Sequence, residues 1–343
     1  MNNPRSLMAQ EIEAVPAVVT LQATELARPL GSLLSRLRRQ TPSLVVTGAR
    51  GSSAHAATFA KHLIERYLGL PVAEAAPSIA SVYGRRLDLK NQLFLAISQS
   101  GSSDDLLALT SDARSSGALT VAITNAPSSA LAQICEVVLP IMAGHEQSVA
   151  ATKTFVATAS VLLRLVGAWA NQADILRGIE GLPARLAAAS KLDWGAACAV
   201  CSQTPHLLTL GRGPTLAMAR EAALKLKEIC GLQAEAYSSA EFLHGPVALI
   251  RPNYPVLVFT PADEATAGVR QLCSALSAKG SHLLIADDVN TAGVLLPVLP
   301  PEQPEADALC LIQSFYVMAV NLAAQLGVDV DRPRHLHKIT RTT

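Results

Sequence analysis

Short apolar runs alternate along this chain with longer stretches in which apolar residues recur at helical spacing. The runs that begin at Leu44 and Leu93 read as buried strands, and each is followed by glycine and serine residues and then by an amphipathic stretch. A further run over 119–124 has the same character. Because strands that alternate with helices form mostly parallel sheets with helices on both faces, the pattern predicts an α/β fold.

The chain also contains an internal repeat. Arg50-Gly51, the helix after it and Gly69-Leu70 are echoed 162 residues later by Arg212-Gly213, a helix and Gly231-Leu232. We therefore expect two similar α/β subdomains in tandem. The expected order is a helical lead-in over 1–40, a first subdomain over 41–170, a helical connector over 171–203, a second subdomain over 204–328 and a polar C-terminal tail over 329–343.

Composition and charge narrow the classes of protein that this chain can represent. Half of the 343 residues are hydrophobic and 16% are charged, which fits a compact core and excludes a disordered chain. The formal net charge is +1 with scattered basic residues, so no nucleic-acid or membrane partner is expected. The N-terminus lacks the order of a signal peptide, and the apolar run over 155–170 is short and interrupted by Arg164.

The cysteines indicate a reducing compartment. Six of them are spread over the chain without the spacing of a small secreted domain, so we expect a cytoplasmic protein. Cys198 and Cys201 form a C-x-x-C pattern, but no second pair or well-placed histidine completes a zinc site. The pair is interpreted as core packing, and no metal site is expected.

The serine-rich segment over 98–103 is the strongest local signal for a ligand. It follows a predicted strand and begins a predicted helix, where free amide groups and the helix dipole favour an anion such as phosphate. The alternative is an ordinary turn in which Ser103 caps the helix. The segment fits neither a Walker A loop nor a dinucleotide fingerprint.

Three further groups could perform acid–base chemistry. Glu221, Lys225 and Glu228 lie at i, i+4 and i+7, on one face of a predicted helix that could hold an anion and shuttle a proton, or simply be solvated. His244 lies in a turn-like segment and could titrate near neutrality, although such a histidine is usually structural. Lys338, in the tail, could form an imine with a carbonyl, or belong to a frayed end.

In their order, these motifs resemble the isomerase domain of glucosamine-6-phosphate synthase and the SIS-type glucosamine-6-phosphate deaminases. The resemblance runs from about Leu44 to the end of the chain. Its carriers are Gly51-Ser-Ser-Ala-His55, Ser98-Gln-Ser-Gly101, Val149-Ala-Ala-Thr-Lys153, Glu221-Ala-Ala-Leu-Lys-Leu-Lys-Glu228, Ala234-Glu-Ala-Tyr237, Glu241-Phe-Leu-His-Gly-Pro246, and Asp329-Val-Asp-Arg-Pro-Arg334 with Lys338.

The resemblance implies a fold of two tandem SIS subdomains, which are flavodoxin-like, and a role for each matching residue. The residues implied to hold the substrate and its 6-phosphate are Ser53, Ser98, Gln99, Ser100, Ser103 and Val149. Glu228 would move the proton between C1 and C2 with Lys225 beside it, and Lys338 would form the imine or assist ring opening. His244 would assist ring opening from the neighbouring subunit, so a homodimer is implied. No cofactor or metal is expected.

Departures from the family pattern bear on the substrate. Ala151 stands where the synthases have a serine, Ser102 and Ser103 stand where they have Glu and Thr, and Arg50 replaces a small residue and could pair structurally or reach the ligand. Only some forty residues precede the sugar-binding region, which leaves no room there for a glutaminase domain. We therefore expect deamination of glucosamine 6-phosphate to fructose 6-phosphate and ammonia.

Two alternatives stay open from the sequence. The first is a deaminase, deglycase or aldose–ketose isomerase for another phosphosugar, such as galactosamine 6-phosphate or a fructose-amine 6-phosphate. The second belongs to another class, a regulator that binds a sugar phosphate without turnover. Against the regulator stands the joint presence of Glu228, His244 and Lys338.

Overall fold

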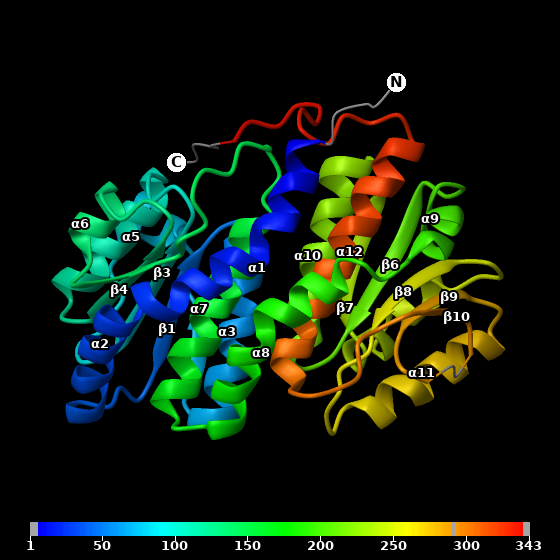
Figure 1. Ribbon diagram of the computed structural model, residues 1–343. Coiled ribbons are helices and arrows are strands. Elements are labelled where there is room, and N and C mark those ends of the chain that lie inside the picture. The colour runs from blue at the N-terminus through cyan, green and yellow to red at the C-terminus, as the bar shows by residue number, and fades with distance from the viewer. Residues whose placement is uncertain (1–5, 290–291, 339–343) are drawn as a thin grey trace. The chain divides into compact units, whose positions relative to one another are not determined.

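Two parallel five-stranded sheets carry the fold (Figure 1). The computed structural model describes residues 6–289 and 292–338 and divides into two compact units, each built on one sheet. Unit A comprises Ala17–Glu146, Lys153–Ile179 and the chain from His337. Unit B comprises the chain up to Pro16, Gln147–Thr152 and Glu180–Leu336.

Unit A contains the first sheet, with strand order β2-β1-β3-β4-β5 and parallel pairing throughout. Its strands are β1 (Val45–Ala49), β2 (Val72–Glu74), β3 (Leu93–Ser98), β4 (Leu119–Thr124) and β5 (Val137–Pro140). Its helices are α2 (Ala27–Arg39), α3 (Ser52–Leu68), α4 (Ser78–Ser81), α5 (Asp104–Ser115), α6 (Ala130–Ile134) and α7 (Lys153–Trp169). The helices α1 (Leu7–Glu25) and α8 (Ala173–Ala189) each contribute residues to both units.

The core of unit A explains why its central strands are apolar on both faces. All six residues of β3 are buried, because α5 and α6 cover one face of the sheet while α3 and α7 pack on the other (Figure 1). On the α5 face, Phe94 packs with Leu106 and Leu131. Each such side chain contributes about 1.5–3 kcal/mol through removal from water.

Unit B contains the second sheet, with strand order β10-β9-β8-β6-β7, again parallel. Its strands are β6 (His206–Gly211), β7 (Gln233–Ser238), β8 (Pro255–Phe259), β9 (His282–Ala286) and β10 (Val294–Leu296). Its helices are α9 (Gly195–Cys201), α10 (Pro214–Cys230), the 3-10 turns η1 (Glu241–Leu243) and η2 (Pro246–Leu249), α11 (Thr266–Ala278) and α12 (Pro304–Gln325).

The two sheets have the same topology. Read from β7, the order β7-β6-β8-β9-β10 repeats the order β2-β1-β3-β4-β5, which confirms the predicted α/β class with two tandem subdomains. In each sheet the order in which successive strands are added reverses between two neighbouring strands. These strands are β1 and β3 in the first sheet and β6 and β8 in the second. Ligands of such folds bind outside the carboxyl ends of the strands at this switch point. The exact subdomain boundaries that the sequence suggested stay a prediction.

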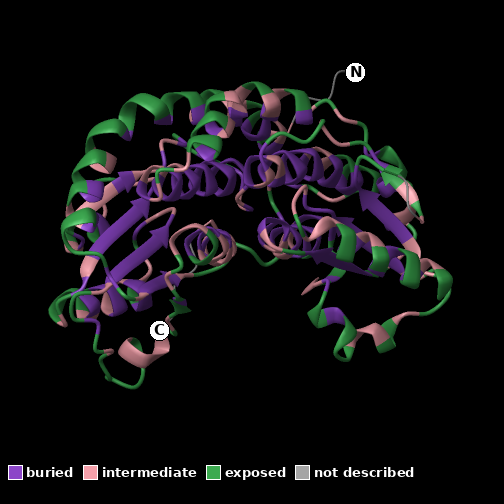
Figure 2. Cartoon of the chain, turned by 90° about the horizontal axis from the view of Figure 1, so that it is seen from below, coloured by how far each residue is buried: buried purple, intermediate pink, exposed green. Residues whose placement is uncertain are grey.

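The apolar helices are interior elements. The run predicted over 155–170 is α7, most of which is buried. Among the described residues, α12 is long and apolar enough to cross a membrane, but 78% of its most apolar window is buried, as in the core helix of a globular unit. Figure 2 shows central strands of both sheets in the buried class, as the all-buried β3 and β8 illustrate.

Candidate active site

The serine-rich loop of unit A leaves the carboxyl end of β3 and leads into α5. Ser98 is buried, and its Oγ accepts a hydrogen bond from the amide of Gly101 at 3.1 Å, which folds the loop back over the strand end. Ser100 and Ser102 are joined through their hydroxyls at 2.9 Å. Ser103 occupies the N-cap position, but its hydroxyl makes no capping hydrogen bond. The capping alternative therefore does not account for the Ser103 side chain.

Backbone geometry keeps this loop tight. Gly101 has φ of +62°, and a Cβ at this position would lie 2.1 Å from Ser129 Oγ. The carbonyl of Gly101 accepts from Leu131, whereas no hydrogen bond reaches the amides of Ser102 and Ser103 within the described ranges. Amide groups oriented in this way at the start of a helix are suited to an anion.

Arg50 and Ser53 lie in the equivalent loop after β1. The Arg50 guanidinium donates to Asp105 Oδ2 from Nε at 3.0 Å and from Nη2 at 2.7 Å. The Asp105 carboxylate is fully buried in the first turn of α5, so this pair ties the two loops together. The structural alternative for Arg50 is thus the one observed. Ser53 lies in the first turn of α3 and is half-buried.

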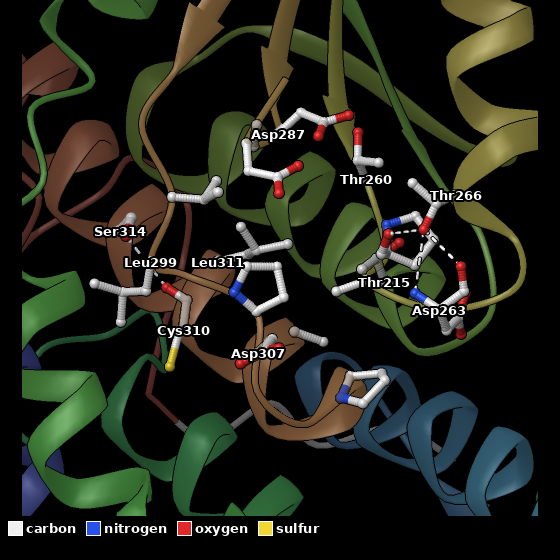
Figure 3. Close-up of a pocket in the computed structure, with 18 of the residues that line it drawn as sticks. Thr215, Thr260, Asp263, Thr266, Asp287, Leu299, Asp307, Cys310, Leu311 and Ser314 are labelled. Carbon is white, nitrogen blue, oxygen red and sulfur yellow. Dashed lines mark hydrogen bonds between the residues drawn. The ribbon is translucent and has the colours of Figure 1, made fainter. Parts of the chain in front are cut away.

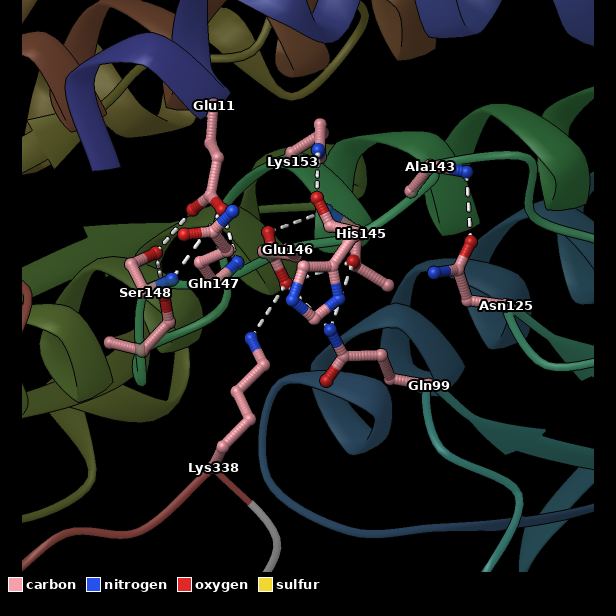
Figure 4. A network of polar contacts seen from close by, with 12 residues as sticks. Glu11, Gln99, Asn125, Ala143, His145, Glu146, Gln147, Ser148, Lys153 and Lys338 are labelled. Atoms are coloured by element: carbon pink, nitrogen blue, oxygen red, sulfur yellow. Dashed lines mark hydrogen bonds and ion pairs between the residues drawn. The ribbon is translucent and has the colours of Figure 1, made fainter. Parts of the chain in front are cut away.

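Glu146 is the centre of a polar network that the sequence did not reveal (Figure 4). Its buried carboxylate accepts from Gln99 Nε2 at 2.7 Å, from Lys338 Nζ at 3.2 Å and from both the amide and the hydroxyl of Thr154, at 3.1 and 2.8 Å. Unit A therefore brings together two predicted residues, Gln99 of the serine loop and Lys338 of the tail. The only sign of this network in the sequence is that Glu146 itself lies shortly before the Val149–Lys153 motif.

Unit B holds Val149 beside a second buried glutamate. Glu11 of α1 accepts hydrogen bonds from the amide of Gln147 and from the hydroxyl of Ser148 (Figure 4). Val149 follows directly and is half-buried. These hydrogen bonds fix the segment that carries Val149, a residue that was expected to bind the substrate.

The charged residues of α10 are interior groups of unit B. Lys225 is fully buried, lies 3.4 Å from Glu221 Oε1 and forms an ion pair with Glu228. Glu221 also accepts from the buried Tyr316 hydroxyl of α12 at 3.2 Å. The side chain of Glu228 is 21% exposed. The solvated-face alternative is therefore wrong for Glu221 and Lys225, because α12 packs against α10.

His244 differs from the other predicted residues in its surroundings. It follows η1 and is exposed, with exposed leucines on either side at Leu243 and Leu249. Unit B itself does not bury this histidine.

The cysteines do not take part in these networks. All six are buried free thiols, including Cys198 and Cys201. Burial raises the pKa of Cys201 to about 12, so this thiol is protonated and unreactive at neutral pH. In the part of the chain that the structure describes, no group of three or more His, Cys, Asp or Glu residues could hold a metal ion.

Comparison with known proteins gives a consistent result. Residues 37–167 and 201–320 match the SIS domain family. The glutamine–fructose-6-phosphate aminotransferase (isomerizing) of Bradyrhizobium diazoefficiens is 31% identical over 358 residues, which cover 98% of this chain and 59% of that protein. The chain thus spans about three fifths of the length of the curated relatives that it matches.

Two solved structures match almost the whole length of the chain. A protein from Silicibacter pomeroyi DSS-3, provisionally named a phosphosugar isomerase, is 42% identical with a TM-score of 0.91, and the match covers 95% of this chain and 100% of that one. The C-terminal domain of glucosamine-fructose-6-phosphate aminotransferase from Francisella tularensis is 25% identical with a TM-score of 0.84, over 96% and 99% of the two chains.

Proposed function

Because this chain belongs to the SIS domain family, we propose that it is an enzyme of the phosphosugar isomerase type that interconverts glucosamine 6-phosphate with fructose 6-phosphate and ammonia. We choose fructose 6-phosphate because it appears in the names of the aminotransferase relatives. The deaminating direction needs only the amino sugar phosphate and water, and is the direction that we propose to test.

The serine loop of unit A is proposed to bind the 6-phosphate. The hydroxyls of Ser98, Ser100 and Ser103, together with the loop amides, are the donors, and Gln99 adds an amide group held by Glu146. Ser53 and Val149 are proposed to contact the sugar. Binding through fixed donors positions the substrate without a metal or cofactor.

Glu228 is proposed to move the proton. After ring opening, its carboxylate removes the C2 proton of the aldehyde form and returns it to C1, which gives the imine at C2. Water adds to C2 and ammonia leaves, so that fructose 6-phosphate is released. Lys225 holds the Glu228 carboxylate in place through their ion pair.

His244 and Lys338 are proposed to assist ring opening, His244 from a second subunit of a cytoplasmic homodimer. Lys338 can also form an imine with the open-chain carbonyl, and its contact with Glu146 orients its amino group. The specificity for one amino sugar is proposed to depend on Ala151, where the synthases have a hydroxyl.

The observation that carries the proposal is the α10 arrangement, a buried lysine that joins one buried carboxylate to one accessible carboxylate. Purified protein with glucosamine 6-phosphate should release ammonia and fructose 6-phosphate in equal amounts. Glu228→Gln should abolish both while phosphosugar binding persists, and Glu180→Gln, at an exposed position of α8, should change neither. Binding without release in the wild-type protein would favour the regulator.

The proposed sharing of His244 has its own test. Mixed dimers of His244→Asn and Glu228→Gln subunits contain one site with both residues intact if His244 acts across the dimer. Activity should then return on mixing two inactive variants. Mixtures that stay inactive, with mixed dimers verified by mass spectrometry, would show that His244 acts within its own subunit.

A further inference from the structure

Unit B contains a cavity of about 380 Å³ that the proposed reaction does not use (Figure 3). It lies at the carboxyl ends of β8 and β9 and is closed by the loop after β10 and the first turns of α12. Its size is within the range of about 300–1,000 Å³ for small-molecule sites.

The cavity occupies the switch point of the second sheet. Thr215, in the first turn of α10, and Thr260, directly after β8, both line it. They lie 162 residues after Ser53 and Ser98, which is the offset of the internal repeat. The cavity is therefore the counterpart in unit B of the loops that are proposed to hold the phosphosugar in unit A.

This counterpart has acidic residues at two positions where the loops of unit A have neutral ones. By the same offset, Asp263 replaces Gly101 and Asp287 replaces Asn125. The cavity is lined by four carboxylates and two guanidiniums, a formal balance of −2; these are Asp263, Asp287, Asp288, Asp307, Arg185 and Arg270.

Both guanidiniums are already neutralised. Arg185 pairs with Asp307 at 2.6 Å, and Arg270 pairs with both Asp287 and Asp288. Burial alone would raise the pKa of Asp287, but the hydrogen bonds from Arg270 and other donors lower it, so this carboxylate is ionised at neutral pH. A phosphate would meet net negative charge here.

Two buried polar atoms of cavity-lining residues lack a hydrogen-bond partner among the described residues, Arg185 Nε and Thr260 Oγ1. Thr260 is 7% exposed, and its Oγ1 has no hydrogen-bond partner among the residues that the structure describes. Such groups are normally satisfied by protein, water or ligand. Leu299 and Leu311 form an apolar wall of the same cavity (Figure 3). A hydroxyl to satisfy, carboxylates that accept O–H and N–H groups, and an apolar wall together fit the faces of a sugar ring.

We propose that this cavity is a second ligand site, which binds an unphosphorylated sugar of neutral or amine-bearing type. D-glucosamine is the probe that matches its charge, and D-glucose 6-phosphate is the anionic counterpart that it should reject. The site is separate in its residues from those proposed for catalysis, so it can be occupied whether or not the chain is a deaminase.

The test is a titration of the full chain with D-glucosamine, with fructose 6-phosphate present in excess to occupy the phosphosugar site. Saturable glucosamine binding is expected under these conditions, with D-glucose 6-phosphate unable to displace it. Thr260→Val should weaken it by about 3- to 10-fold, the value of one neutral hydrogen bond. Thr47→Val is the matched control, because Thr47 Oγ1 is also buried and without a partner in the described chain but lies in unit A.

The outcomes separate clearly. Neither substitution should lower the melting temperature, since each replaces an unsatisfied hydroxyl by a methyl of the same shape. No glucosamine binding, binding that fructose 6-phosphate abolishes, or equal affinity in Thr260→Val and wild type would each overturn the second site. Failure of the deaminase assay with glucosamine binding intact would overturn the proposed function alone.

Discussion

Lys338 Nζ donates to Glu146 Oε2 across 3.2 Å, although 192 residues separate the two in the chain. The same oxygen accepts from Gln99 and Thr154, so one buried carboxylate fixes both a residue of the serine loop and the lysine of the tail. The contact gives the C-terminal lysine a defined place within unit A. It also makes Glu146 a positioning residue, and its loss should alter the positions of Gln99 and Lys338.

Replacement of Glu146 by Gln should lower kcat by about 10- to 100-fold, because Lys338 loses its anionic partner. The buried network should also lose about 1–3 kcal/mol of stability. Turnover, melting temperature and borohydride trapping of an imine on Lys338 measure the effect, and trapping should fall with kcat. Glu136→Gln removes the carboxylate of a surface pair with Arg36 and should leave all three unchanged. Trapping that is unaffected in Glu146→Gln would contradict the positioning role.

Lys225→Met should destabilise unit B by about 3–5 kcal/mol, because Glu221 would be left as a buried charge without its cation. Denaturant unfolding measures the loss. Lys61→Met is the control, since Lys61 and Glu65 form an exposed pair at 3.9 Å whose removal should cost no more than about 0.5 kcal/mol. Similar losses in the two variants would show that the α10 pair is solvated in solution.

Gly101→Ala should raise KM for the phosphosugar by distorting the serine loop. The substitution places a methyl group against Ser129 Oγ at a positive φ, so it combines a clash with backbone strain. Gly84→Ala isolates the strain, because Gly84 has φ of +56° and open space around the new Cβ. Gly84→Ala should cost about 1 kcal/mol and leave KM unchanged. Equal KM values for all three proteins would exclude the loop from binding.

The buried thiols predict an alkaline loss of stability. Burial raises the pKa of Cys135, Cys230 and Cys273 to about 12, whereas unfolded thiols titrate near 8.5. The unfolded state therefore loses protons first, and the free energy of unfolding should fall as the pH rises from about 9 to about 12. Each thiol should contribute about 2 kcal/mol to this loss by pH 10.

Unfolding curves at pH 8 and pH 10 measure this loss. In Cys273→Ala, the free energy of unfolding should fall less between pH 8 and pH 10 than it does in wild type. The difference should equal the contribution of one thiol. A thiol-specific chromogenic reagent at pH 8 should react with none of the cysteines of the native protein and with all six after denaturation. Rapid labelling of the native protein would contradict the burial of these groups.

The sequence predicted the central elements of the fold because local signals and tertiary packing agree there. The run over 93–98 and the run over 119–124 coincide with β3 and β4. Strands β2 and β10 were not predicted, since three residues at a sheet edge carry no clear alternation. The strand order of the second sheet is likewise a tertiary property, although the repeat indicated that the two halves would share one topology.

The candidate residues were predicted less completely than the fold. Residues within one motif, such as Lys225 and Glu228, could be recognised because helical spacing places them together. Glu146 could not, since its partners lie in the serine loop, in α7 and in the tail. The burial of Glu221 was equally hidden, because it depends on Tyr316 of a helix almost one hundred positions later.

The shared strand order of the two sheets has a consequence for how this protein can change. A duplicated scaffold offers two strand-end regions of the same topology, each supported by its own hydrophobic core. Substitutions can change the charge at the strand ends of one sheet without altering the hydroxyl-rich loop of the other sheet. Asp263 and Asp287 are such differences in unit B. Duplication thus frees half of the molecule to recognise a second molecule while the other half keeps its inherited chemistry.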